Sequence, residues 1–159
     1  MAALSPHTTT PKRSQVQLGA AGVGVVFILV GIAGFIPGIT TRYMNMEVAG
    51  NGSDAQLLGL FRVSVLHNVI HLLFGVAGLY FSRTALRARN FLLYGGFVYA
   101  AFFFYGIVIE YQSRANFVPF DDADNVLHFA LAAGMITLSF FLDRGPGWRE
   151  VIEEGRAEV

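Results

Sequence analysis

The sequence predicts an all-α protein, a four-helix transmembrane bundle with short cytoplasmic and longer outer loops. More than half of the 159 residues are hydrophobic (54%), whereas 14% are charged. The apolar residues come in four blocks, each close to the roughly 20 residues that cross a hydrocarbon core. Lysine and arginine gather in every second connection, as they do in multi-pass membrane proteins. A soluble domain would instead spread its apolar residues over amphipathic segments.

The blocks and the basic residues together predict the organisation of the chain. Basic residues precede the first block, fill the second connection and follow the fourth block. The positive-inside rule therefore places both termini in the cytoplasm of a protein of the cell membrane. We expect a polar tail over 1–14, a membrane domain over 15–143 and a charged tail over 144–159, with spans at about 17–36, 57–81, 91–109 and 126–142.

The first block is rich in glycine and predicts a packing surface. Ala20 and Gly24, and again Gly34 and Gly38, form small-x-x-x-small pairs. Small residues let helix backbones approach closely in lipid, where the hydrophobic effect no longer drives helices together. Pro37 and Gly38 end the block, and the outer loop that follows contains turn-prone residues.

The second block carries a polar stripe on an otherwise apolar helix. At helical spacing one face contains Ser64, His67, Asn68, His71, Gly75 and Gly78. Ionisable groups inside a membrane segment are costly and usually turn towards a partner or cavity. This stripe is therefore the default place to look for a functional site.

The third and fourth blocks add further polar residues. Glu110 ends a stripe that runs along the third block, about 31 Å above Arg89 at 1.5 Å per residue and so near the outer boundary. Asp121, Asp122 and Asp124 precede the fourth span, where an aspartate is a preferred N-cap. The tripeptide ending in His67 is repeated at His128, and both imidazoles lie about 22 Å above the cytoplasmic ends of their helices.

Four interpretations of these polar residues remain open. In the first, His67, His71 and His128, with Glu110, bind zinc or copper. In the second, His67 or His71 pairs with His128 as axial ligands of a haem. In the third, the histidines form a proton-sensitive network with Glu110 and Asp124. In the last, they only hydrogen-bond between helices of a cofactor-free accessory subunit.

Composition limits the function classes. Cysteine is absent, which excludes disulfides and thiolate metal ligands. Zero net charge and the lack of a long basic run argue against a nucleic-acid partner. No phosphate-binding loop, nucleophile elbow or His-Glu-x-x-His sequence occurs, so the chain gives no strong signal of an enzyme. The expected partners are the lipid bilayer and either further copies of the chain or a larger membrane complex.

Two long stretches carry a family resemblance. Residues 57–78, which contain His67 and His71, and residues 116–128, which end at His128, resemble a family of small, largely actinobacterial membrane proteins catalogued as a domain of unknown function. The resemblance covers about residues 16–142. It implies a four-span integral membrane protein and no particular activity, cofactor or catalytic residue.

Overall fold

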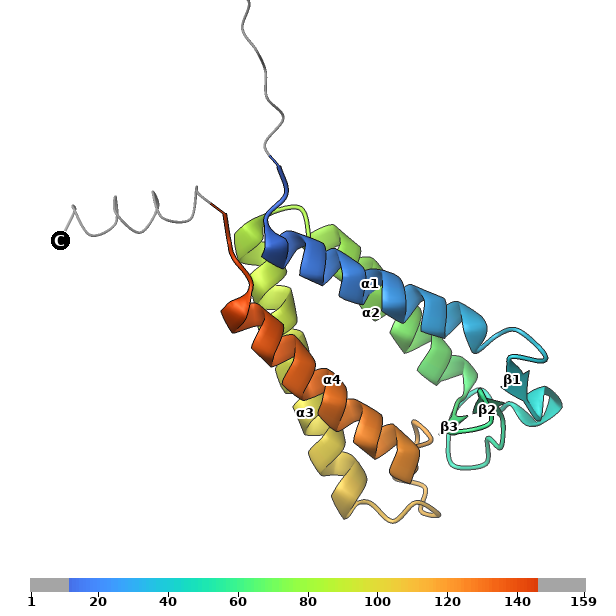
Figure 1. Ribbon diagram of the computed structural model, residues 1–159. Helices are drawn as coiled ribbons and strands as arrows, with labels where there is room; N and C mark the ends of the chain where they lie inside the picture. The colour runs from blue at the N-terminus through green and yellow to red at the C-terminus, as the bar shows by residue number, and fades with distance from the viewer. Residues whose placement is uncertain (1–11, 146–159) are drawn as a thin grey trace, which may run out of the picture.

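The computed structural model describes residues 12–145 and confirms the four-helix architecture (Figure 1). Predictions about residues 1–11 and 146–159 lie outside the described residues. The helices are α1 (Gln15–Ala33), α2 (Val65–Phe81), α3 (Ala85–Val108) and α4 (Asp122–Phe141). Among them α1, α3 and α4 are long and apolar enough to cross a membrane, and α2 is a shorter apolar helix of 17 residues.

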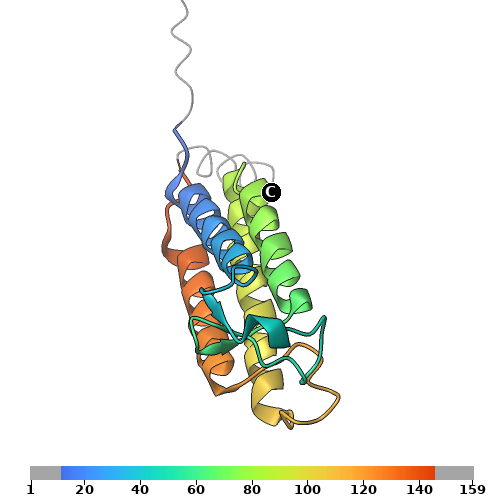
Figure 2. The same cartoon turned by 90° about the vertical axis from the view of Figure 1, so that its right-hand side faces the viewer.

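The helices pack as two antiparallel pairs, α1 with α2 and α3 with α4. The pairs lie close together at the end where α1 begins and diverge towards the other end (Figure 1). Figure 2 shows all four helices running lengthwise, with the small strands in front, on the side that faces the viewer. We call the end where α1 begins, and where the two pairs lie close together, the narrow end, and the opposite end, where they diverge, the open end.

Side chains cap the helix starts. Ser64 accepts a hydrogen bond from the backbone N–H of His67, 3.1 Å away, and so begins α2. The Asp121 carboxylate accepts one from the N–H of Asp124 at 3.0 Å and begins α4. The predicted aspartate cap is thereby confirmed, and Ser64 belongs to the cap rather than to the helical stripe.

Glycines allow α1 and α2 to meet backbone to backbone. A Cβ atom on Gly24 would lie 2.8 Å from the carbonyl oxygen of Gly75 and 2.9 Å from the backbone nitrogen of Leu79. One on Gly75 would in turn lie 2.7 Å from the carbonyl oxygen of Gly24. The first glycine-rich block is therefore a packing surface at Gly24, as predicted. Gly38 of the second predicted pair lies beyond α1, and a Cβ there would meet no atom within 4 Å.

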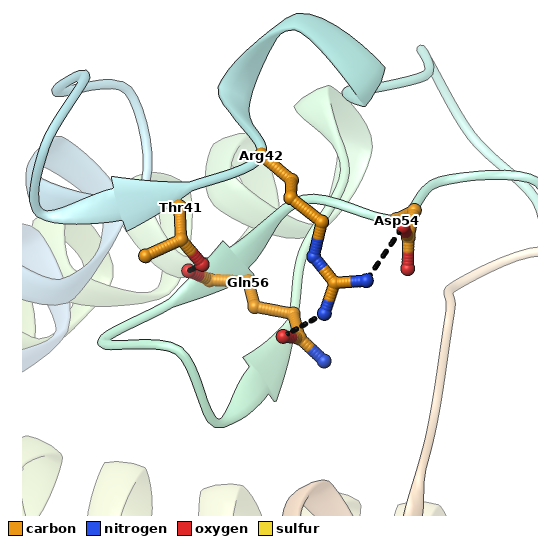
Figure 3. Close-up of polar contacts among 4 residues, drawn as sticks. All are labelled: Thr41, Arg42, Asp54 and Gln56. Carbon is orange, nitrogen blue, oxygen red and sulfur yellow. Dashed lines mark hydrogen bonds and ion pairs between the residues drawn. The ribbon is translucent and has the colours of Figure 1, made fainter.

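A small antiparallel sheet closes the connection from α1 to α2. Its strands β1 (Thr40–Thr41), β2 (Gln56–Leu57) and β3 (Phe61–Arg62) are paired in that order, and the short 3₁₀ helix η1 (Tyr43–Asn45) follows β1. Figure 3 shows how side chains support the sheet. Arg42 forms an ion pair of 2.7 Å with Asp54 and also bonds Gln56, while the Thr41 hydroxyl donates to the Gln56 carbonyl at 3.2 Å.

The sheet changes one predicted boundary. Hydropathy places the second span at 57–81, but residues 56–62 form β2 and β3, and α2 begins at Val65. The turn between the strands contains Leu58 and Gly59 with φ angles of 55° and 72°. These left-handed conformations are incompatible with a continuing helix.

Hydrogen bonds fasten the narrow end. The Gln17 amide donates to the carbonyls of Ser82 and Arg83, at 3.1 and 2.8 Å, and so ties the start of α1 to the turn between α2 and α3. The backbone N–H of Val16 donates to the carbonyl of Asp143 at 3.1 Å, just beyond α4. The apolar core lies between the helices, and large apolar side chains also cover the outer surface, among them Leu29 (59% exposed), Phe104 (62%) and Phe129 (57%). Such a surface suits contact with lipid.

Candidate functional site

The two histidines of α2 form a buried stacked pair. Their spacing of one helical turn places the rings with centroids 4.6 Å apart and an angle of 19° between their planes. His67 and His71 are 6% and 5% exposed. The Nδ1 atom of His71 lies 3.1 Å from the carbonyl oxygen of His67. Because a carbonyl only accepts, Nδ1 of His71 carries the proton, and Nε2 keeps its lone pair when the ring is neutral.

His128 approaches this pair from α4 through an aromatic environment. Its ring lies 5.5 Å from that of Tyr99, 5.7 Å from that of Phe102 and 4.9 Å from that of Phe120, measured between centroids. It is 3% exposed, and its Nδ1 atom has no hydrogen-bond partner among residues 12–145. The three imidazoles are close enough to interact electrostatically.

A cavity of about 20 Å³ lies where the three histidines meet. It is lined by all three imidazoles together with Tyr99 and aromatic and aliphatic neighbours. A cavity needs about 10–15 Å³ to hold one water molecule. The space is therefore sufficient for a water or a single ion and far too small for a haem macrocycle in this arrangement.

A second cavity, of about 160 Å³, lies at the open end between the two helix pairs. His67, Asn68 and His71 line it from α2, Asp124 lines it from α4, and apolar residues of α1, α4 and the β2–β3 region complete the wall. The stacked histidines thus face both cavities. Asp124 is 1% exposed, and its Oδ2 atom has no hydrogen-bond partner among the described residues.

Glu110 does not join the histidines. It follows α3, is exposed, and lines neither histidine cavity. Within residues 12–145 no three His, Asp or Glu side chains stand in an arrangement that would hold a metal ion. Zinc or copper binding by the predicted set would therefore require its side chains to move.

Sequence reasoning missed the contribution of the loop between α3 and α4. Phe120 covers the His128 ring edge-on, and Val118 lines the smaller cavity. The Asn116 side chain holds this loop in place with hydrogen bonds to both backbone groups of Phe120, at 2.9 and 3.1 Å. The apolar run 117–120 was the available signal, because a loop facing water is seldom so apolar.

The same loop carries a polar contact to the start of α4. The Tyr111 hydroxyl donates to the Asp122 carboxylate at 2.9 Å and accepts from the Asn125 amide at 2.7 Å. Partial burial, the hydrogen bond to Asp122 and the nearby aspartate charges raise the pKa of Tyr111 to about 12. The phenol therefore stays protonated at physiological pH and keeps donating this bond.

Comparisons with known proteins give the family and no more. No curated protein and no solved structure matches the chain. The model of a domain of unknown function, DUF4383, matches residues 17–141, a range that includes all four helices almost entirely. The match confirms the predicted resemblance. The chain belongs to the DUF4383 family.

Proposed function

We propose that this chain is a four-span protein of the cell membrane, with both termini in the cytoplasm, that senses protons through His67, His71 and His128. The observation that carries the proposal is the buried stack of His67 on His71, 4.6 Å between centroids, beside a cavity shared with His128. Histidine is the side chain whose unperturbed pKa places its change of charge between pH 5 and 8. Ionisable groups buried in a membrane segment favour such a role.

Protonation acts on this stack through charge repulsion. Two unit charges separated by 4.6 Å, the distance between the centroids, repel by roughly 3 to 4 kcal/mol at an effective dielectric of 20. Neutral rings pack there without that cost. A proton on each ring therefore favours an arrangement in which the two rings separate and water enters.

Charged and titratable neighbours set the balance of this response. α4 contributes Asp124 as well as His128, α3 contributes Tyr99, and α1 has no titratable residue. Arg62 of β3 interacts through its main chain with both His67 and Asp124. The carboxyl group of Asp124 is thus the available partner for a proton or a positive charge at the open end.

The response follows from the arrangement of the helix pairs. Hydrogen bonds from Gln17 and Val16 fasten the narrow end, whereas both histidine cavities lie towards the open end. Because His67 and His71 both lie on α2 and His128 lies on α4, it is repulsion between the charged α2 histidines and a charged His128 that is expected to separate the pairs at the open end, with the narrow end acting as the hinge. This movement would convert an external change in pH into a change of shape.

Histidine titration in the full chain tests the proposal. Imidazole NMR signals are followed from pH 8 to pH 5 in lipid nanodiscs, for the wild type and for His67→Gln, His71→Gln and His128→Gln. We expect the histidines to titrate as a coupled set, so that removing one shifts the midpoints of the other two. Independent titration, or none in this range, would leave only a packing role for the imidazoles.

Binding of zinc or copper at the same histidines is a second candidate function. The observation that favours it is that the Nδ1 atoms of His67 and His128 have no hydrogen-bond partner among residues 12–145. Neutral imidazole is the commonest protein ligand for these metals. Elemental analysis tests this candidate function on the wild type, His67→Ala and His128→Ala, each purified without chelator or nickel. Stoichiometric metal in the wild type that is lost in both variants supports binding. A metal-free wild type contradicts it.

A further inference from the structure

A groove of about 370 Å³ runs between α2 and α3 on the surface of the bundle. It shares no lining residue with either histidine cavity. Its wall is almost entirely apolar and aromatic, with Phe74 and Phe91 among the rings that form it. The volume is within the range of small-molecule sites, and the groove is separate from the proposed proton-sensing site.

The charged side chain and the amide side chain of the groove lie at one end. Arg87 and Asn90, from the first turns of α3, line the groove near the α2–α3 turn, whereas Gly95 and Val98 line it further along the helix. From Arg87 to Val98 the helix rises about 16 Å at 1.5 Å per residue. Half of a hydrocarbon core of about 30 Å is about 15 Å. The groove therefore extends from the headgroup level to the middle of the bilayer.

The basic end of the groove has a surplus of positive charge. Three arginines lie at this turn and the start of α3, and two of them rest over aromatic rings: Arg83 over Tyr80 at 5.0 Å and Arg89 over Phe140 at 5.5 Å. Arg87 is the one whose side chain lines the groove. No Asp or Glu is among the residues that line it. A negatively charged group at this end would be stabilised.

We propose that this groove binds one anionic phospholipid, with one of its two acyl chains along Phe74, Phe91 and Gly95 and its phosphate headgroup at Arg87 and Asn90. The apolar length fits one leaflet, and the guanidinium supplies the hydrogen-bond donors that a phosphate oxygen accepts. Basic pockets between membrane helices are recognised sites for anionic headgroups. A free phosphate would not use the apolar wall, so the ligand is a lipid.

Lipid retention by the full chain tests the proposal. Protein in mild detergent is incubated with dioleoyl phosphatidylglycerol or dioleoyl phosphatidylcholine, and bound lipid is counted by native mass spectrometry. One favourable charge near the membrane surface corresponds to about a fivefold preference for the anionic lipid. We expect Arg87→Gln to abolish this preference and Arg87→Lys to retain most of it. The matched control is Arg114→Gln, an exposed arginine of the loop between α3 and α4, which should behave as the wild type.

A second pair of variants tests the apolar part of the groove. Val98→Phe fills its deep end and should reduce the retention of both lipids, whereas Val108→Phe, at an exposed position that does not line the groove, should not. Equal retention of the two lipids by the wild type would overturn the proposal. So would equal losses in Arg87→Gln and Arg114→Gln, or unchanged retention in Val98→Phe.

Discussion

Both helix pairs pack closely, but different kinds of atoms meet at their two interfaces. In the α1–α2 pair, a glycine of α1 lies directly against the backbone of α2: Gly24 contacts Gly75 and the peptide group that follows Gly78. In the α3–α4 pair the closest atoms belong to side chains: a Cβ on Gly95 would lie 2.6 Å from the terminal methyl of Met135, and one on Gly106 would collide with the Asn125 amide. A Cβ on Gly96 would likewise lie 2.6 Å from the Ile136 side chain, with the α4 backbone further away, at 3.1 Å. The first interface is therefore rigid and intolerant of added atoms, and the second is adjustable.

This difference bears on which pair can respond to a change at the histidines. His67 and His71 lie on the helix whose contact with α1 is fixed by backbone, whereas His128 lies on the helix held by adaptable side chains. Side chains at the far end of a rotatable bond can shift at low cost, and backbone atoms cannot. We therefore expect the α1–α2 pair to act as a rigid body and the α3–α4 pair to accommodate movement.

The largest effect is expected from adding one methyl group to the rigid interface. Gly24→Ala would place a Cβ within 2.9 Å of two α2 backbone atoms, which would force the helices apart. We expect the free energy of unfolding to fall by about 3 kcal/mol, the upper range for overpacking. Thermal unfolding followed by circular dichroism in detergent measures it. Gly22→Ala is the matched control, since no heavy atom lies within 4 Å of its Cβ position, and equal losses in the two variants would contradict the comparison.

A smaller effect is expected at the connection within the α3–α4 pair. Tyr111→Phe removes the hydroxyl that donates to Asp122 and accepts from Asn125. Two hydrogen bonds of ordinary net strength correspond to about 1 to 2 kcal/mol of unfolding free energy. Denaturation of the variant beside the wild type gives the value. A change below about 0.3 kcal/mol would show that solvent replaces both bonds.

Alkaline titration tests the hydrogen bonds of Tyr111. Because the pKa of Tyr111 is raised to about 12 from its ordinary value of 10.0, the folded state holds the phenolic proton more tightly than the unfolded state. This contribution to stability is present below pH 10 and is lost as pH rises towards 12. The ultraviolet absorbance of the wild type and of Tyr111→Phe is followed as the pH is raised, and the variant should lack one phenol that titrates near pH 12. If the phenol that the variant lacks titrates at pH 10 instead, the hydrogen-bonded geometry of Tyr111 is contradicted.

The adjustable interface should tolerate the methyl group that the rigid one rejects. Gly95→Ala approaches only the ends of two side chains, Met135 and Phe74. We expect a loss of about 1 kcal/mol or less, because both can shift. The same unfolding assay applies, and a loss as large as that of Gly24→Ala would remove the distinction between the pairs.

The smallest effect is expected in the small sheet. Arg42 and Asp54 form an exposed ion pair, with side chains 50% and 44% exposed. Arg42→Gln should change the unfolding free energy by about 0.5 kcal/mol, and added salt should reduce the difference further. A salt-independent change above 1 kcal/mol would mean that Arg42 organises the sheet in the connection from α1 to α2.

The helices could be predicted because long apolar blocks permit few alternatives in a membrane. The prediction that an apolar block forms a helix failed at Leu57 to Phe61, where apolar residues form part of a sheet. Hydropathy indicates burial and not backbone conformation. The approach of His71 to His67 follows from helical spacing alone. The aromatic cover that Phe120 gives His128 does not, because the path of a loop depends on tertiary contacts such as those of Asn116.

The predicted role of Glu110 illustrates the same limit. A rise of 1.5 Å per residue estimates the height of a residue along a helix but not the direction of its side chain once the helix has ended. α3 ends at Val108, and Glu110 lies beyond it in an exposed position. Asp124, one turn before His128, lines the larger cavity instead.

The central claim, that charge on the α2 histidines and on His128 of α4 separates the helix pairs at the open end, is tested most directly by distances between spin labels. The chain has no cysteine, so Ile36→Cys with Val126→Cys labels the open end, and Leu18→Cys with Leu86→Cys labels the narrow end. We predict a longer open-end distance at pH 5 than at pH 8 and an unchanged narrow-end distance. With His67→Gln and His71→Gln combined, the open-end distance should not respond to pH. An open-end distance that is the same at both pH values, or that lengthens equally without the two histidines, would contradict the account.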